Sequence, residues 1–341
     1  MCVVHPETMR TLGYTAPRGR VMIGSYVLLC QSRTEAAIMP GYIGPKREAR
    51  GGTEIAQQKT TTKYPLSAPM AAGIENLRRL DLTTEAKIYF GTAEIEPFSD
   101  MTVSGHGPLL KNGMRLNYAA TDDDFRQTSI YEFLAYVDMA RRFPRLKQIN
   151  IHFSPKQWLD ETQLAGRYGD YDRLIDGVRQ IAGYAARWGI EIVLENNNAY
   201  FDGITDDVPA NHIDWSDRNQ VFGASPEEWF QVCEDVDRPN VALCLDSSHA
   251  CTYAHTFAEP ERREAVVMAF LAKPHLIRHV HWNDNYLFDA RGRTDSHELL
   301  GKGSLPVELH RAIKCLDATL LLEHFYTTEE LEEELEYIDR L

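Results

Sequence analysis

From about residue 70 onward, the sequence alternates between two patterns of hydrophobic positions. Short, almost continuously apolar runs end in polar residues, and longer segments with a helical period follow them. Continuous apolar runs of this length are typical of strands buried on both faces of a parallel sheet. The strands expected on this ground are 86–91, 101–107, 146–154, 190–196, 241–249, 277–284 and 318–325, with the apolar run 20–29 as an eighth.

The segments between these strands carry helix signals. In 171–189, apolar residues recur on one face of a helix. Ser225 begins a capping-box sequence with Pro226 at the first helical position, and Thr327 begins a second one. We therefore expect a helix after most of the strands.

Eight strands that alternate with helices predict an α/β fold, a (β/α)₈ TIM barrel. A doubly wound sheet is the alternative, but no GxGxxG or GxxxxGK[ST] sequence follows the first predicted strand. A chain of 341 residues is compatible with one barrel domain. We expect an irregular arm over 1–19 and a single barrel domain over 20–341. The hydrophobic positions of residues 30–70 show no helical or strand period, so we expect a long first loop there. This loop is interpreted equally well as a mobile loop or as a lid.

The composition limits the classes of partner. Acidic residues outnumber basic ones by 50 to 36, and the formal net charge is −14. Such a surface does not attract polyanions, so it argues against a nucleic-acid partner unless metal ions change the local charge. No run approaches the ~20 apolar residues of a membrane span. The six cysteines are scattered without a CxxC pair, which is typical of reduced thiols in a cytoplasmic protein.

Ionisable residues collect where the predicted strands end, and in a TIM barrel these carboxyl ends form the active-site face. Three acids, Glu195, Asp246 and Glu323, close apolar runs, where a lone carboxylate would carry a large desolvation cost. Lysine and arginine are absent from these strand ends, so a metal ion is the simplest partner. The other ionisable residues at these strand ends are His106, His152, His249 and His281, and Asp295 and His297 lie in the loop after the strand 277–284.

The spacing favours a metal site over scattered polar residues. In "HVHWND", His279 and His281 point to the same side of a strand. His281 lies nearer the mouth and is the better ligand, whereas His279 is a core or supporting histidine. In "LDSSH", Asp246 and His249 can both face the mouth. A single histidine at a strand end is usually structural, but their joint occurrence on successive strands predicts a site for Mn²⁺, Co²⁺, Mg²⁺ or Zn²⁺.

On these motifs the chain resembles the xylose isomerase-like TIM barrel superfamily. That group contains sugar phosphate isomerases and epimerases as well as endonuclease IV. The similar segments occur in family order over about residues 86–326. They are "GHGPLL", "INIHFS", "VLENNN", "LCLDSSHA", "HVHWNDN", "DSHELLGKGSLP" and "LLLEHF". The resemblance implies that one divalent metal, Mn²⁺, Co²⁺ or Mg²⁺, is held by Glu195, Asp246, His281 and Glu323.

The resemblance also implies a reaction on a small-molecule carbohydrate. In the sugar isomerases and epimerases the metal binds two neighbouring oxygens of an open-chain sugar and polarises the carbonyl. Glu195 and Glu323 would then flank the substrate and move the proton α to the carbonyl through an enediolate. Related lyases and dehydratases use the same metal set, so elimination stays open. Substrate contacts are expected from the histidines His106, His152 and His249 and from the aromatic residues Trp158, Tyr200, Phe201 and Trp282.

A second alternative is a zinc-dependent apurinic/apyrimidinic endonuclease similar to endonuclease IV, which uses three zinc ions. We favour the sugar reaction because no stretch interleaves basic and aromatic residues as a nucleic-acid platform would. A non-catalytic carbohydrate- or metal-binding barrel is a third alternative, but it does not need two glutamates on one substrate. The endonuclease pattern falls on His106, His152, Glu195, Asp246, His249, His281, Asp295, His297 and Glu323.

The chain departs from the ketohexose 3-epimerases of the superfamily at two positions. These enzymes carry an arginine six residues after the histidine ligand, where this chain has Leu287, and a glutamate where it has Phe201. We therefore expect a substrate other than a simple free ketohexose, with Arg291 or Arg293 as cations that could reach the site. The loop 197–224 is a candidate pocket wall. Related barrels often associate, so a homo-oligomer is also open.

Overall fold

The computed structural model describes residues 42–48, 59–62, 64–65, 70–87, 99–323 and 327–341. Eight parallel strands within these ranges form a closed ring. Each strand pairs with the next one along the chain, and the last pairs with the first. The α/β, (β/α)₈ TIM-barrel fold is therefore confirmed. In chain order the ring consists of β2 (Lys59–Thr62), β4 (Leu82–Lys87), β5 (Thr102–His106), β8 (Gln148–His152), β10 (Glu191–Glu195), β12 (Val241–Asp246), β13 (Ile277–Trp282) and β14 (Thr319–Leu322).

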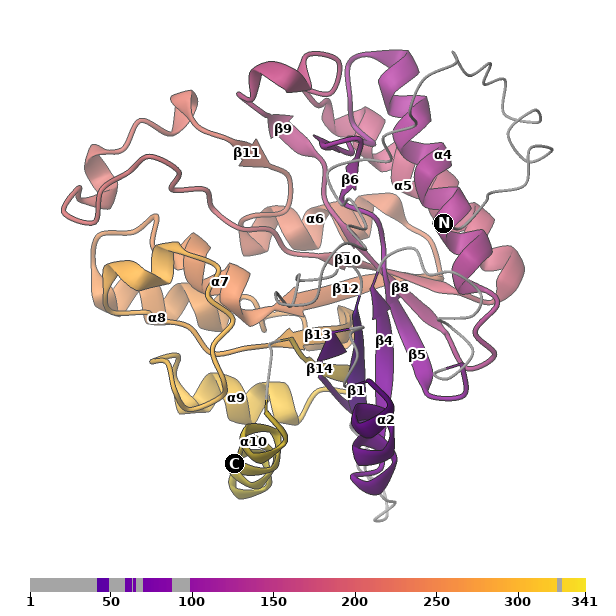
Figure 1. The fold of residues 1–341 in the computed structure, drawn as a ribbon. Coiled ribbons are helices and arrows are strands. Elements are labelled where there is room, and N and C mark those ends of the chain that lie inside the picture. Colours follow the sequence, from indigo (N-terminus) through magenta and orange to yellow (C-terminus); the bar gives the residue numbers. More distant parts are fainter. Residues whose placement is uncertain (1–41, 49–58, 63, 66–69, 88–98, 324–326) are drawn as a thin grey trace, which may run out of the picture.

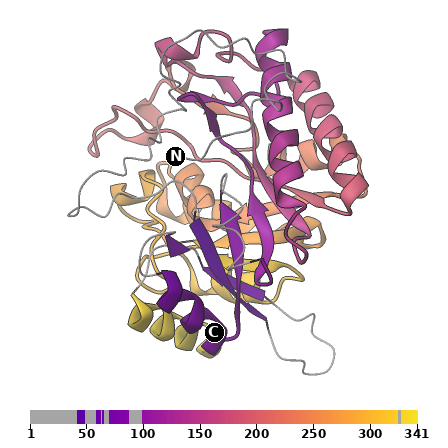
Figure 2. The same cartoon turned by 45° about the vertical axis from the view of Figure 1, so that its right-hand side comes forward.

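Helices surround this ring (Figure 1). The first and the last of them lie side by side (Figure 2), where the Asn76 side chain donates to the Thr328 hydroxyl at 3.4 Å and Arg79 pairs with Glu332. The layer of helices thus closes at the same place as the ring of strands. The helices are α2 (Met70–Arg79), α4 (Asp123–Ala140), α5 (Tyr171–Ala185), α6 (Pro226–Val236), α7 (Ser247–Ala254), α8 (Pro260–Ala269), α9 (Val307–Lys314) and α10 (Thr328–Arg340).

The main apolar core lies between the strands and the helices. The helix predicted over 171–189 is α5, and its buried face runs from Leu174 to Ala185 as the period predicts. Trp229 of α6 is fully buried and donates its indole N–H to the backbone oxygen of Leu194 at 2.8 Å. No helix among the described residues combines the length and the apolar character that a membrane span needs.

Both predicted helix starts are present, with one difference. Glu330 and Thr327 form the complete capping box of α10. At α6, the Ser225 hydroxyl accepts from the Glu228 N–H at 3.2 Å. The Glu228 carboxylate instead accepts from the N–H of Gly223 at 2.8 Å, so it fixes the preceding turn rather than the cap residue.

The structure corrects the predicted organisation of the first part of the barrel. Three strands lie within the range 30–70 that the sequence predicts to be a loop: β2, β1 (Tyr42–Glu48) and β3 (Tyr64–Pro65). β1 runs antiparallel to β2, β3 and β4. The sequence of β2 is KTTT, which is β-branched but has no apolar period, so hydrophobic patterning misses it. The expected arm 1–19 and the expected strand 20–29 lie outside the described residues.

The boundary after β12 also differs from the prediction, which extends the strand to residue 249. The chain instead turns directly into α7, because the Asp246 carboxylate caps this helix. Its Oδ1 atom accepts from the N–H groups of Ser248 at 2.7 Å and His249 at 3.0 Å. His249 therefore lies in the first helical turn, above the end of the strand.

Two small sheets are inserted after strands of the ring, at its carboxyl end. The hairpin of β6 (Leu110–Lys111) and β7 (Met114–Arg115) follows β5. The second sheet pairs β9 (Pro155–Gln157) with β11 (Gln220–Val221), and Figure 1 shows it beyond the end of the ring. Short 3₁₀ helices lie at Glu161–Gln163, Ala186–Trp188, Ala210–His212, Trp215–Asp217, Pro274–Leu276 and Ala290–Arg293.

Candidate metal centre

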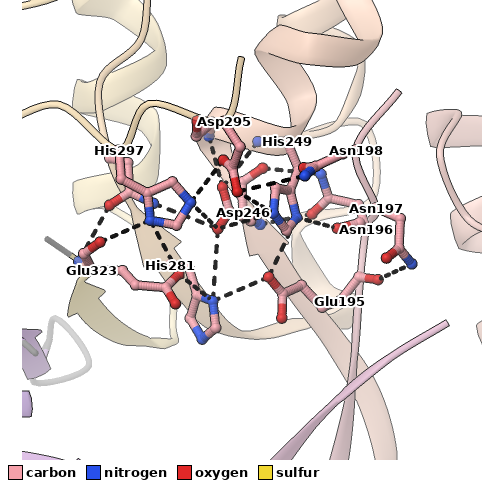
Figure 3. A network of polar contacts seen from close by, with 12 residues as sticks. Glu195, Asn196, Asn197, Asn198, Asp246, His249, His281, Asp295, His297 and Glu323 are labelled. Carbon is pink, nitrogen blue, oxygen red and sulfur yellow. Dashed lines mark hydrogen bonds and ion pairs between the residues drawn. The ribbon is translucent and has the colours of Figure 1, made fainter. Parts of the chain in front are cut away.

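Four ionisable side chains from adjacent strands meet at the carboxyl end of the ring. Glu195 ends β10, Asp246 ends β12, His281 lies on β13 and Glu323 directly follows β14. One ligand atom from each lies within 4.8 Å of the other three (Figure 3). The structure thus brings together the four residues that the sequence suggested as a ligand set, and we call them the strand-end cluster.

The imidazole of His281 is the centre of this cluster. Its Nδ1 atom lies 2.7 Å from an oxygen of Glu323, 3.1 Å from Glu195 and 3.7 Å from Asp246. One N–H group cannot serve three carboxylates at once. All four residues are at most 4 % exposed, so water does not offset the concentrated negative charge. A divalent cation among these four groups fits this donor set.

Asparagine side chains fix the backbone around the cluster. The Asn196 amide donates to the backbone oxygen of Asp246 at 2.9 Å and accepts from its N–H at 2.6 Å. The Asn283 oxygen accepts from the N–H of Glu323 at 3.2 Å. Because Oδ1 of Asp246 caps α7, Oδ2 remains directed toward the cluster. Sequence reasoning missed these supporting residues, although both asparagines directly follow a strand that bears a ligand.

Three histidines near the cluster have Nδ1 bound to a backbone oxygen. The distances are 2.9 Å from His106 to the next residue, 2.7 Å from His249 to Asn196, and 2.8 Å from His297 to Glu323. A carbonyl only accepts, so Nδ1 carries the proton and Nε2 of the neutral ring keeps its lone pair. This orientation suits histidines that bind a metal through Nε2.

His106 and His152 form a pair on one side of the strand-end cluster. Their Nε2 atoms are 3.1 Å apart, and Nε2 of His152 lies 3.0 Å from a Glu195 oxygen. The Asn150 side chain donates to this same oxygen of Glu195. Two imidazole lone pairs and a carboxylate at these distances repel unless a proton or a cation lies between them.

A second set, the loop-side group, consists of His249, Asp295 and His297. Asp295 lies 2.7 Å from Nε2 of His297 and 3.2 Å from Nε2 of His249. Together with Asp246, these residues place four ligand atoms within 4.8 Å of one another. All nine residues of the predicted multinuclear set therefore lie at one end of the barrel, as part of Figure 3 shows.

Burial and charge act in opposite directions on the protonation of these groups. Burial alone raises the pKa of Glu195, but the neighbouring His152 and His281 hold that pKa well below its usual range. Burial alone lowers the pKa of His249, but Asp246 and Asp295 raise it to about 10. Burial lowers the pKa of His152 itself, whereas His249 is charged without a metal and compensates the neighbouring carboxylates. A bound cation would take over this role.

Two residues of the strand that bears His281 have different environments. His279 is buried below it, with Nε2 3.0 Å from Glu85, which agrees with the predicted supporting role. Trp282 corrects the prediction of a substrate contact: it is fully buried in the outer core and donates to His310 of α9 at 3.1 Å. Successive strand residues face opposite ways, so an inward His281 requires an outward Trp282.

The two arginines expected to reach the site are bound elsewhere. Arg291 pairs with Asp289 at 2.7 Å. Arg293 donates to the backbone oxygens of Thr205 at 3.2 Å and Val208 at 2.6 Å. The structure therefore places neither guanidinium at the cluster, and the expectation is corrected.

The loop 197–224 forms part of a cavity beside the centre, which agrees with its interpretation as a pocket wall. The cavity has a volume of about 430 Å³, and Tyr200 and Trp215 of the loop line it. Asn198 also lines it, and its amide nitrogen lies 3.5 Å from Asp295 (Figure 3). The cavity therefore adjoins the loop-side group.

The fold of this barrel also occurs in a known protein family. The chain belongs to the xylose isomerase-like TIM barrel family, whose model matches residues 76–341. A D-psicose 3-epimerase from Clostridium cellulolyticum H10, solved with D-tagatose, is 14% identical, with coverage of 81% of this chain and 94% of that chain and a TM-score of 0.51. A D-tagatose 3-epimerase-like protein is 19% identical over 73% and 85%, with a TM-score of 0.50. At these identities the likeness shows the fold. No curated protein matches the chain.

Proposed function

We propose that the protein is a divalent-metal-dependent isomerase or epimerase of a sugar or sugar derivative. The observation that carries this proposal is the convergence of three buried carboxylates on Nδ1 of His281. The family membership agrees with it, and so does the fold shared with a protein named as a D-psicose 3-epimerase. The ligand set suits Mn²⁺, Co²⁺ or Mg²⁺.

Different residues of the site would bind the metal, transfer the proton and hold the substrate. A metal held by Glu195, Asp246, His281 and Glu323 would polarise a carbonyl and orient the hydroxyl beside it. Glu195 and Glu323 approach His281 from different strands, so they can lie on two sides of a bound sugar. One glutamate, as the carboxylate, would remove the proton next to the carbonyl to give an enediolate, and the other, as the carboxylic acid, would return a proton to it. His249, in the first turn of α7, would hold a sugar oxygen.

The experiment that tests this proposal starts with the metal content of the purified protein. About one Mn, Co or Mg per chain is expected by elemental analysis. Ketoses and keto-glycosides are then incubated with the loaded protein in D₂O, and exchange of the proton next to the carbonyl is followed by NMR. Metal-loaded protein that exchanges no such proton would contradict the proposal. Product analysis separates isomerisation from elimination, which uses the same ligands.

A second candidate function is metal-dependent phosphodiester cleavage of abasic-site DNA by three zinc ions. The observation that favours it is that the His106–His152 pair and the loop-side group flank the strand-end cluster, and that each supplies a further set of ligand atoms within 4.8 Å of one another. The net charge of −14 argues against a DNA partner. About three Zn per chain together with cleavage of abasic DNA would reverse the ranking.

A further inference from the structure

One arginine near the candidate metal centre forms no ion pair with an acidic residue in the part of the chain that the structure describes. Arg115 ends β7 in the hairpin that follows β5, and it is half-buried. Its Nη2 atom donates to the side-chain oxygen of Asn197 at 3.3 Å, and no described carboxylate forms an ion pair with it. A partly buried cation without a counter-charge is costly. In a chain with 50 acidic and 36 basic residues, this position is available for an external anion.

The surrounding residues hold Arg115 in place before any ligand arrives. Gln163, which is buried, accepts from the Arg115 N–H at 2.9 Å and donates to its backbone oxygen at 2.6 Å. The guanidinium carbon lies 4.9 Å from the centre of the Trp158 ring and 5.8 Å from that of Tyr200. Stacking of this kind stabilises the charge, and the N–H groups that do not contact Asn197 or Tyr200 can donate to a carboxylate or a phosphate.

The guanidinium is connected to the candidate metal centre by a short path. The Asn197 oxygen that accepts from Arg115 also lies 3.3 Å from Nδ1 of His152. Nε2 of the same imidazole lies 3.0 Å from Glu195. Only one amide and one imidazole therefore separate the guanidinium from the strand-end cluster, and a single small molecule can contact both.

Other cations near the mouth are already engaged. Lys156 pairs with Glu228 at 2.7 Å. Arg291 pairs with Asp289, and Arg293 donates to two backbone oxygens. Lys156 and Arg291 are thus neutralised by carboxylates, and backbone oxygens at 205 and 208 hold Arg293 away from the cluster. Of these four cations around the described part of the mouth, Arg115 is the one linked through Asn197 and His152 to the strand-end cluster.

We propose that Arg115 binds a terminal anionic group of the substrate, a carboxylate or a phosphate remote from the reacting carbonyl. This inference rests on the proposed function and deepens it, because it makes the substrate class an acidic sugar rather than a neutral one. The stacked, edge-exposed guanidinium would recognise either oxyanion by paired hydrogen bonds. It also agrees with Leu287 and Phe201, which replace the polar residues expected for a simple ketohexose.

The test compares three ketoses that share a C2 carbonyl but differ at C6: D-fructose, D-fructose 6-phosphate and D-fructuronate. Their dissociation constants for the Mn²⁺-loaded protein are measured by calorimetry, which requires no turnover. We expect at least one anionic ketose to bind about tenfold more tightly than D-fructose, a typical effect of a charge-assisted hydrogen bond. The more tightly bound one identifies the anion as phosphate or carboxylate. If neither anionic ketose binds more tightly than D-fructose, the proposal is overturned.

Variants assign this preference to one residue. Arg115→Met should abolish the preference for the anionic ketose, and Arg115→Lys should restore it only in part. Arg141→Met is the matched control, because Arg141 also stacks on an aromatic ring, Trp188 at 4.1 Å, but lies at the end of α4. A preference that survives Arg115→Met refutes the assignment, provided that elemental analysis shows unchanged metal content. Anion preference without proton exchange would refute the proposed isomerase and leave the anion site standing.

Discussion

The strand-end cluster and the loop-side group lie next to each other, but they are held in different ways. The residues of the strand-end cluster are at most 4 % exposed, and the register of adjacent parallel strands, such as Asp246 opposite His281, sets their positions. In the loop-side group, the side chains of Asp295 and His297 are 30% and 21% exposed. The barrel thus dictates one set of ligands directly, and the other depends on how a loop is anchored.

The loop that carries Asp295 and His297 has its own supports. Asp284 and Glu298 exchange two backbone hydrogen bonds, at 2.8 and 3.0 Å, across the base of this loop. His255 of the turn after α7 binds the backbone oxygen of Tyr286 at 2.9 Å. These contacts can loosen without opening the ring of strands. We therefore expect the strand-end cluster to bind metal more robustly than the loop-side group.

Metal removal should have the largest effect on the strand-end cluster. We expect EDTA to abolish proton exchange on the substrate and Mn²⁺ or Co²⁺ to restore it, because three buried carboxylates lose their shared cation. The free energy of unfolding should fall by about 4 kcal/mol relative to protein at a metal concentration one thousand times the dissociation constant. Urea unfolding with and without metal measures this change. Unchanged activity in metal-free protein would refute the mechanism.

Neutralising one glutamate should have the next largest effect. Glu195→Gln or Glu323→Gln is expected to lower turnover by at least about 10³-fold, because each removes a proton-transfer group and a metal ligand at once. Metal affinity should fall, while the circular dichroism spectrum stays the same. Substrate that still binds to Glu323→Gln without turnover would also exclude a purely binding barrel. Full activity in either variant would contradict the assigned roles.

A change in the loop-side group should have a smaller effect. If the strand-end cluster binds the catalytic metal, His297→Ala should keep about one metal per chain and lower turnover by no more than about tenfold. His281→Ala is the matched control and should lose the metal. Elemental analysis of both variants distinguishes the two groups. A loss of one ion out of three in His297→Ala would favour the multinuclear alternative.

The last prediction concerns the effect of acid on stability through His255, which is buried beside the loop. Burial lowers the pKa of His255 to about 4, and the neutral ring donates to Tyr286. The unfolded chain has a pKa near 6.5 for this group, so it binds the proton more readily. The stabilisation is therefore complete above about pH 6.5 and is lost as the pH falls toward 4.

A variant isolates this contribution. His255→Gln keeps a side-chain donor but does not titrate, so its free energy of unfolding should depend less on pH. Between pH 7 and pH 5 the difference from the natural protein should be about 2 kcal/mol. Urea unfolding of the metal-free proteins at the two values measures it. The same pH dependence in both proteins would mean that burial does not hold His255 in its neutral form.

The hydrophobic pattern predicted most of the barrel but not its first strand. The strands from β5 to β14 were recognisable because both faces of a parallel strand are buried and therefore apolar. β2 escaped this reasoning because its three threonines pair with β14 through the backbone, which any residue can do. The direction of Trp282 was misjudged, although the alternation from an inward His281 already implies an outward side chain.

The sequence by itself determined which residue types end the strands, and thereby most of the nine candidate ligands, because these follow apolar runs on local segments. Asp295 and His297 lie instead in the loop after β13. Only the tertiary structure decided which of the nine share a point in space, how the asparagines orient them and where Arg115 lies. Gln163 holds Arg115 from 48 positions away in the chain, and Asn197 contacts it from 82 positions away. Contacts at such separations depend on how the closed ring places its loops, and no local pattern records that arrangement.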